Sequence, residues 1–179
     1  ICYGRNLDGQ TARCGGWGNL LDDEGSGYAI GRDILRALLW AQDGRGPATR
    51  LTALVQAHLG SAQPGDIIRF VYAPGRNKRE IAAISTLLPP ALAEGDEAAM
   101  DIAHKAADGL AMLCPPVLGS LGLQGGELAL AGGVLAHIPL IHQRVREQLN
   151  RQYPGLSIIA PRHSPAWGAA DFAREAYLK

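Results

Sequence analysis

The chain has no excess of charge and no long hydrophobic run, and these two absences exclude several classes of protein. Its 17 basic and 17 acidic side chains balance, and no cluster of Lys or Arg could follow a phosphate backbone or an anionic membrane. No stretch reaches the roughly 18 consecutive apolar residues of a membrane-spanning helix, and no leader-type segment opens the sequence. We therefore expect no nucleic-acid partner, no membrane association and a cytoplasmic location.

Cysteine and histidine are also too sparse, or too poorly spaced, for a metal centre. The three cysteines, Cys2, Cys14 and Cys114, form no CxxC pair, which argues against a disulfide framework and against a zinc or iron–sulfur site. His137 and His142 are five residues apart, whereas two ligands on one helical face are four apart. We expect reduced thiols, no metal ligands and, within these residues, no catalytic side chain.

The chain does contain enough apolar residues to form one hydrophobic core of ordinary size. It has 179 residues, of which 47% are hydrophobic, and this predicts a single domain. The first residues already have the composition of a β-strand, so we expect further protein upstream of Ile1.

The pattern of turns and apolar residues predicts an α/β protein. Turn residues at 6–9 predict a hairpin of strands 1–5 and 10–14, with Cys2 beside Cys14 at its base. Ser26 is a suitable N-cap for an amphipathic helix that runs to about Gln42, and Pro47 suits the first turn of a second helix. The remaining predicted elements are helices at 47–58, 67–72, 79–88 and 96–113, a strand at 127–131, a helix at 138–152, a strand at 156–160 and a helix at 165–177.

The densest candidate site is the glycine-rich segment 15–27. Its glycines allow the backbone to approach a ligand, Trp17 offers a flat apolar face, and a carboxylate can accept two hydroxyl hydrogen bonds. The acidic run 22–24 would repel a phosphate at the start of the following helix, so the segment suits a neutral polyol or a cation. The alternative, which stays open, is an acidic helix start that is stabilised by the helix dipole and binds nothing.

A second candidate site follows the predicted strand near residue 130. There the strand runs into Gly132 and Gly133 before a helix, which is where α/β sheets open a crevice for ligands. Glycine would let an adenine ring or a phosphate lie against the main chain, although a tight strand-to-helix turn is the more common reason for such a pair. The chain contains neither a GxGxxG motif nor a P-loop.

These segments resemble a known family. The first candidate site resembles the signature of the N-acetylglucosamine kinases, which belong to the BadF/BadG/BcrA/BcrD family of actin-like ATPases. Weaker similarities follow in the family's order along nearly the whole chain. The matching segments are 14–18, 23–28, 71–72, 79–82, 92–96, 130–134 and 164–170.

The resemblance implies a ribonuclease H-like second lobe of an actin-like ATPase, with a helical insertion at about 47–113. Residues 1–179 would form this carboxyl-terminal lobe, and the amino-terminal lobe would lie outside the chain. By analogy, the sugar would contact Gly16, Trp17, Gly18 and Asp23. The adenosine part of ATP would contact Ala93, Gly132, Gly133 and Val134.

The family also uses parts that this sequence lacks. The first phosphate loop and the aspartate that acts as general base on the sugar hydroxyl are absent, and the second phosphate loop would come just before Ile1. ATP and Mg²⁺ are the implied cofactors, an amino sugar is the implied substrate, and a homodimer is left open. The expected activity is therefore phosphorylation of N-acetylglucosamine or glucosamine by the intact kinase, with the fragment alone inactive.

Two other functions stay open. An activator ATPase would use hydrolysis to drive a partner enzyme and would hold an iron–sulfur cluster through cysteines at a dimer interface. A sugar-binding lobe without catalysis is the third possibility. The sequence does not distinguish glucosamine from N-acetylglucosamine, nor the hydroxyl that is phosphorylated.

Overall fold

The chain begins with a β-hairpin, as the turn residues predict. The computed structural model describes residues 1–177, and in it β1 (Cys2–Arg5) pairs antiparallel with β2 (Thr11–Cys14). The Asn6 carboxamide accepts a hydrogen bond from the Gln10 backbone N–H at 2.9 Å, which closes the turn. Cys2 and Cys14 face each other in the register, so the predicted proximity is confirmed.

The central helix is α1 (Gly27–Gln42), and its start follows the predicted cap. The Ser26 hydroxyl accepts a hydrogen bond from the Ala29 N–H at 3.0 Å. Ile30, Ile34 and Leu38 lie on one face and are buried, as expected for a broad apolar stripe. This face packs against α4 (Lys78–Ala83), a following 3-10 turn (Ile84–Leu87) and α6 (Glu97–Met112).

The region between α1 and α6 contains three more helices, and one of them begins later than predicted. These helices are α2 (Leu51–Leu59), α3 (Pro64–Val71) and α5 (Leu88–Ala93). Pro47 precedes α2 instead of occupying its first turn. The reason is that Asp96 accepts hydrogen bonds from the Thr49 hydroxyl at 2.9 Å and from the Arg50 N–H at 2.6 Å, which fixes the chain before the helix starts.

The proline pair at 115–116 both ends one helix and starts another. As predicted, α6 stops before it, but the pair occupies the first turn of α7 (Cys114–Leu121), a helix that was not predicted. Prolines are tolerated there because the first N–H groups of a helix have no partner within it. Helix α7 packs against the hairpin and covers β1 and β2.

The last third has the predicted β-α-β-α order. β3 (Glu127–Ala129) pairs parallel with β4 (Ser157–Ile159), and the connection contains α8 (Gly133–His137) and α9 (Pro139–Gln152). Helix α10 (Pro165–Tyr177) follows, and the Ser164 hydroxyl accepts from the Trp167 N–H as an N-cap. The predicted single helix at 138–152 is confirmed apart from its first residue, since Ile138 separates α8 from α9.

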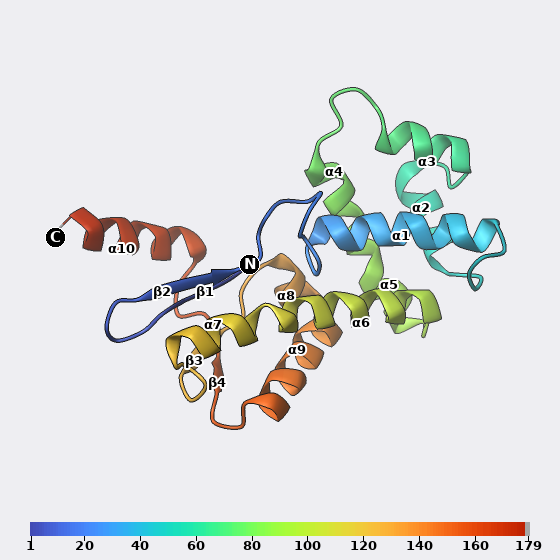
Figure 1. The fold of residues 1–179 in the computed structure, drawn as a ribbon. Helices are drawn as coiled ribbons and strands as arrows, with labels where there is room; N and C mark the ends of the chain where they lie inside the picture. Colours follow the sequence, from blue (N-terminus) through green and yellow to red (C-terminus); the bar gives the residue numbers. More distant parts are fainter. Residues whose placement is uncertain (178–179) are drawn as a thin grey trace.

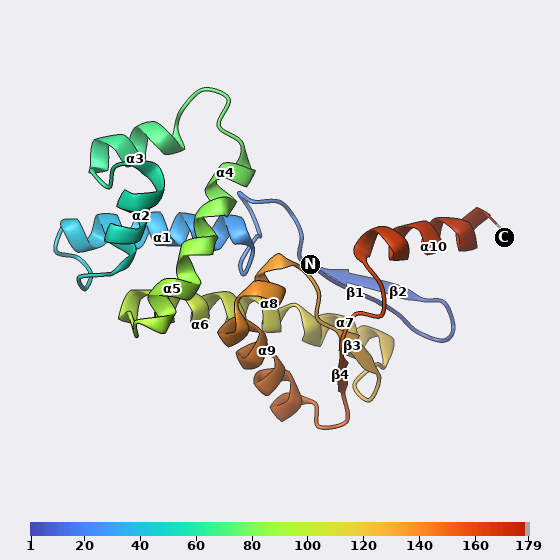
Figure 2. The same ribbon diagram turned by 180° about the vertical axis from the view of Figure 1, so that it is seen from behind.

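The helices form the bulk of the molecule, and the strands lie at one end of it (Figure 1). Helix α6 lies between α1 and α9 and packs against both, so the buried core runs through these three helices. Seen from behind, α10 extends away from the helical part and lies near the hairpin (Figure 2), where the Phe172 ring meets the Tyr3 ring edge-on at 6.5 Å. Among the described residues the strands form two separate two-stranded sheets.

Candidate functional site

The glycine-rich segment after β2 is a loop whose shape depends on its glycines. Gly15, Gly16 and Gly18 all have positive φ values, a conformation that other residues adopt only with strain. At Gly15 a Cβ would also lie 2.6 Å from the Leu113 side chain, at the end of α6. The loop therefore lies directly against α6.

The acidic run forms the turn that starts α1. The Asp23 carboxylate accepts a hydrogen bond from the Ser26 hydroxyl at 2.6 Å, and the Glu24 carboxylate accepts one from the Asp23 N–H at 3.1 Å. Ser26 in turn caps the helix, so Asp23 orients the capping residue. One oxygen of Asp23 is engaged in this way, and the second oxygen has further lone pairs for a ligand.

Gly25 holds this turn against α6. Its φ is +80°, and a Cβ at this position would lie 2.3 Å from the Leu110 side chain and 2.8 Å from the Ala106 carbonyl oxygen. From the other side, a Cβ at Gly109 would lie 2.8 Å from the Glu24 side chain. Two glycines, one on each element, thus allow the acidic turn and the helix to touch.

A cavity of about 110 Å³ lies between the loop, the turn and α6. Of the residues predicted to contact the sugar, Gly16 and Asp23 line it, together with Asp22, Glu24 and Ser26. Its other lining residues are Ile1, Gly25, Gly109, Leu110 and Leu113. The lining thus combines carboxylates and a hydroxyl with apolar carbons, which are the kinds of group that a sugar ring contacts.

Trp17 and Gly18 lie outside the lining of this cavity. The Trp17 side chain is 64% exposed, and the Arg13 guanidinium lies 4.3 Å from the centre of its ring. Such a cation–π contact orients the indole beside the loop. The structure thus brings Gly16 and Asp23 together and places Trp17 on the surface next to them.

A larger cavity, of about 470 Å³, lies beside the second glycine motif. Gly133 and Val134 line it from α8, and Ser85, Thr86 and Pro89 line it from the opposite side. Nothing lies within 4 Å of a Cβ placed on Gly133, so the backbone there is open to a ligand. Gly132 has a φ of +115° and is the N-cap of α8, immediately beside the cavity.

Ala93 does not line the cavity that contains Gly133 and Val134. It is the last residue of α5 and is exposed, and it is absent from the described lining of the 470 Å³ cavity. By contrast, Ser85, Thr86 and His137 line this cavity and were not expected from the sequence. No local pattern marks them, because their elements meet only in the folded chain.

The 110 Å³ and 470 Å³ cavities are both bounded by the start of α1. Ser26 lines the smaller one, and its neighbour Gly27, the first residue of α1, lines the larger one. Free N–H groups at a helix start attract partial or full negative charge. This end of α1 therefore separates a polyol-sized space from a nucleoside-sized space.

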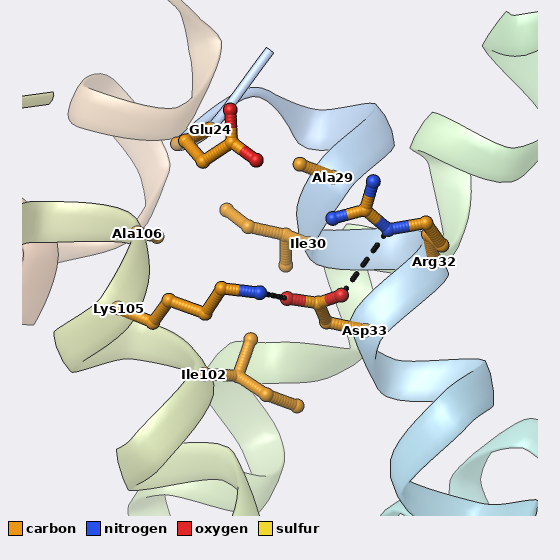
Figure 3. Close-up of a pocket in the computed structure, with 9 residues that line it drawn as sticks. Glu24, Ala29, Ile30, Arg32, Asp33, Ile102, Lys105 and Ala106 are labelled. Atoms are coloured by element: carbon orange, nitrogen blue, oxygen red, sulfur yellow. Dashed lines mark hydrogen bonds and ion pairs between the residues drawn. The ribbon is translucent and has the colours of Figure 1, made fainter. Parts of the chain in front are cut away.

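A much smaller cavity lies behind the acidic turn (Figure 3). Its volume is about 10 Å³, enough for one water molecule, and Glu24 and Gly25 form one side of it. Lys105 and Arg32 project toward Asp33 in this view, and both form ion pairs with it. This space is too small for a substrate.

The thiols lie close together at the base of the hairpin. A hydrogen bond from the Cys114 thiol lowers the pKa of Cys2 to about 7, and the same contact, together with burial, raises the pKa of Cys114. Across residues 1–177, no three His, Cys, Asp or Glu side chains are placed to hold a metal ion. The helices of this part of the chain are likewise too short or too polar to span a bilayer.

Comparison with known proteins first establishes the class. The fold superposes on the structure of a Chromobacterium violaceum protein assigned as an N-acetylglucosamine kinase, with a TM-score of 0.70 and 23% identity, over 93% of this chain and 53% of that one. The fold is thus that of the actin-like ATPases, and the expected fold class is confirmed.

The family follows from the sequence match. The model of the BadF/BadG/BcrA/BcrD ATPase family matches residues 1–173, and the chain belongs to this family. It is 37% identical to an N-acetylmuramic acid/N-acetylglucosamine kinase of Clostridium acetobutylicum and 35% identical to an N-acetyl-D-glucosamine kinase of Dictyostelium discoideum. These matches cover 97% of this chain but only 58% and 56% of the two relatives, so the chain spans little more than half of their length.

Proposed function

We propose that this chain forms one lobe of an ATP-dependent amino-sugar kinase, with about 47–113 as its helical insertion. The observation behind the proposal is that two cavities of different size meet at the start of α1. Gly16 and Asp23 line the smaller cavity, and Gly133 and Val134 line the larger one. The named relatives favour kinase activity over an activator ATPase.

In this proposal the smaller cavity binds the amino sugar. The free lone pairs of Asp23 accept hydrogen bonds from neighbouring hydroxyls, while Leu110 and Leu113 contact the apolar face of the ring. Trp17, which is held by Arg13, lies at the edge and covers the sugar when the lobes close. Gly18 allows the loop to bend at this point.

The larger cavity would hold the adenosine part of ATP. The open backbone at Gly133 and the hydroxyls of Ser85 and Thr86 fit a flat base and a ribose, and 470 Å³ is sufficient for both. ATP supplies the phosphoryl group when it is bound. We assign the general base and the Mg²⁺ ligands to residues outside this chain.

The proposal can be tested by Asp23→Asn in the intact protein. A charge-assisted hydrogen bond contributes roughly 1.5–3 kcal/mol, so kcat/KM for N-acetylglucosamine or glucosamine should fall at least about tenfold. The KM for ATP should change far less, because the nucleotide occupies the other cavity. Steady-state kinetics with each substrate varied in turn would measure both values.

Two further variants separate sugar binding from helix capping. Ser26→Ala removes the hydroxyl that donates a hydrogen bond to Asp23 and that caps the start of α1. It leaves the Asp23 carboxylate in place. Because Ser26 also lines the cavity, the readout for capping is the free energy of unfolding: if both variants lowered it equally and Asp23→Asn left kcat/KM unchanged, the aspartate would act only through the helix. Asp8→Asn, in the exposed hairpin turn, should have no effect. An unchanged kcat/KM in folded Asp23→Asn would contradict the proposed sugar site.

A further inference from the structure

A fourth cavity, of about 260 Å³, lies on the carboxyl-terminal part of α1 and is separate from both proposed substrate sites. It is bounded by the carboxyl-terminal half of α1, by α6 and by the segment 45–47 that follows α1. None of its described lining residues lines the 110 Å³ or the 470 Å³ cavity. The proposed kinase reaction leaves this space without a role.

Three cationic side chains line this cavity: Arg36, Arg45 and Lys105. The Trp40 ring holds two of them in place, because the guanidinium carbons of Arg36 and Arg45 lie 5.0 and 5.5 Å from the ring centre. A cation that is already fixed loses less rotamer entropy when a ligand binds. The cavity thus presents preorganised positive charge.

The nearby carboxylates cancel much of this charge but not all of it. Asp33 is only 6% exposed, and it forms ion pairs with Lys105 at 2.7 Å, Arg32 at 3.2 Å and Arg36 at 3.3 Å. The lining itself holds Arg36, Arg45 and Lys105 against the carboxylates of Asp33 and Asp101, which leaves a net charge of +1. Figure 3 shows Lys105 and Arg32 converging on Asp33. Arg45 is paired with Asp43 on the exposed side.

Positive charge at the cavity favours an anionic ligand, and the other lining residues indicate which chemical group the anion carries. Ala37, Pro47 and Ile102 provide apolar carbons that can cover one face of a ring. Asp101, an exposed carboxylate on α6, also lines the cavity. It would repel a second anionic group, but it can accept hydrogen bonds from hydroxyls.

We propose that this cavity binds a small phosphorylated sugar of hexose monophosphate size. Arg36, Arg45 and Lys105 would contact the phosphate, Ile102 and Pro47 the ring, and Asp101 the hydroxyls. Because the site shares no lining residue with the 110 Å³ and 470 Å³ cavities, a ligand here would leave the proposed active site free. A phosphorylated amino sugar, the product class of the proposed reaction, has this chemistry.

Calorimetric titration of the intact protein with glucosamine 6-phosphate would test the site. In the presence of saturating N-acetylglucosamine, which blocks the proposed sugar site, we expect one saturable binding event. Arg45→Gln and Lys105→Gln should each weaken it at least fivefold. Arg69→Gln removes an exposed arginine that pairs with Asp66 on α3 and should leave the affinity unchanged.

Three results would overturn the proposal. The first is no saturable binding up to millimolar concentration. The second is binding that N-acetylglucosamine or Asp23→Asn abolishes and Arg45→Gln does not, which would place the ligand in the proposed active site. The third is equal affinity for free phosphate, which would exclude recognition of the sugar. A protein without kinase activity could still give the expected titration, so the two proposals fail independently.

Discussion

Cys2 and Cys114 share one hydrogen bond, and this bond makes the two thiols chemically different. The contact favours the thiolate of Cys2, whose pKa falls to about 7, whereas Cys114 stays protonated because its pKa is raised by the same contact and by burial. Cys2 is only partly buried, whereas Cys114 is buried. Reactivity of a thiol follows its thiolate fraction and its access to reagent.

We therefore expect Cys2 to be the most reactive thiol near neutral pH. Its alkylation rate by iodoacetamide, followed by peptide mass spectrometry, should rise with pH through a midpoint of about 7. Cys114→Ala removes the hydrogen-bond donor, which destabilises the thiolate and should shift the midpoint up toward the ordinary value of about 8.5. Cys14→Ala should leave the midpoint near 7. An unchanged midpoint in Cys114→Ala would contradict this assignment.

At the scale of elements, the contact between the acidic turn and α6 depends on Gly25. An alanine there must adopt a positive φ and displace the Leu110 side chain and the Ala106 carbonyl. Backbone strain and overpacking each cost roughly 1–3 kcal/mol, so Gly25→Ala should lower the free energy of unfolding by about 2–6 kcal/mol. Chemical denaturation would measure this loss.

Gly44→Ala is the matched control. Gly44 follows α1, has a φ of +74° and has no atom within 4 Å of the place that a Cβ would occupy, so only the backbone strain applies. Its loss should be about 1–3 kcal/mol, the backbone strain alone. Equal losses at the two positions would show that the close approach to α6 contributes nothing.

The elements that were predicted well are those specified by neighbouring residues. The hairpin follows from the turn at Asn6, and α1 follows from the Ser26 cap and its apolar stripe. Helix α7 was missed because a proline pair can either end or begin a helix, and only packing against the hairpin decides between them. The late start of α2 depends on Asp96, which is 46 residues from Arg50 in the sequence.

In the candidate site, too, the residues specified by local sequence were predicted and those brought in by packing were not. The sequence indicated Asp23 and Gly133 as residues of two separate ligand regions, and the structure places them on two different cavities. It gave no indication of Leu110 or Ser85, which reach those cavities from α6 and from the turn after α4. Local chemistry identified the loops, whereas the opposite walls depend on how the helices pack.

At the scale of the whole molecule, we expect the isolated 179-residue chain to have no kinase activity. The chain spans 58% and 56% of the two relatives, and the proposal assigns the general base to the remainder. A coupled assay with Mg-ATP and either amino sugar should give only background, while the intact protein turns over. Turnover that scales with the concentration of the fragment and disappears in Asp23→Asn would show that the chain is sufficient.

The shared helix end has a thermodynamic consequence. Ser26 and Gly27 are adjacent residues on different cavities, so the start of α1 is the covalent connection between the two proposed ligand sites. By linkage, the factor by which a ligand in one cavity changes affinity in the other must equal the factor in the reverse direction. A sugar that tightened ATP binding through this connection would therefore itself be bound more tightly, by the same factor, when ATP is present.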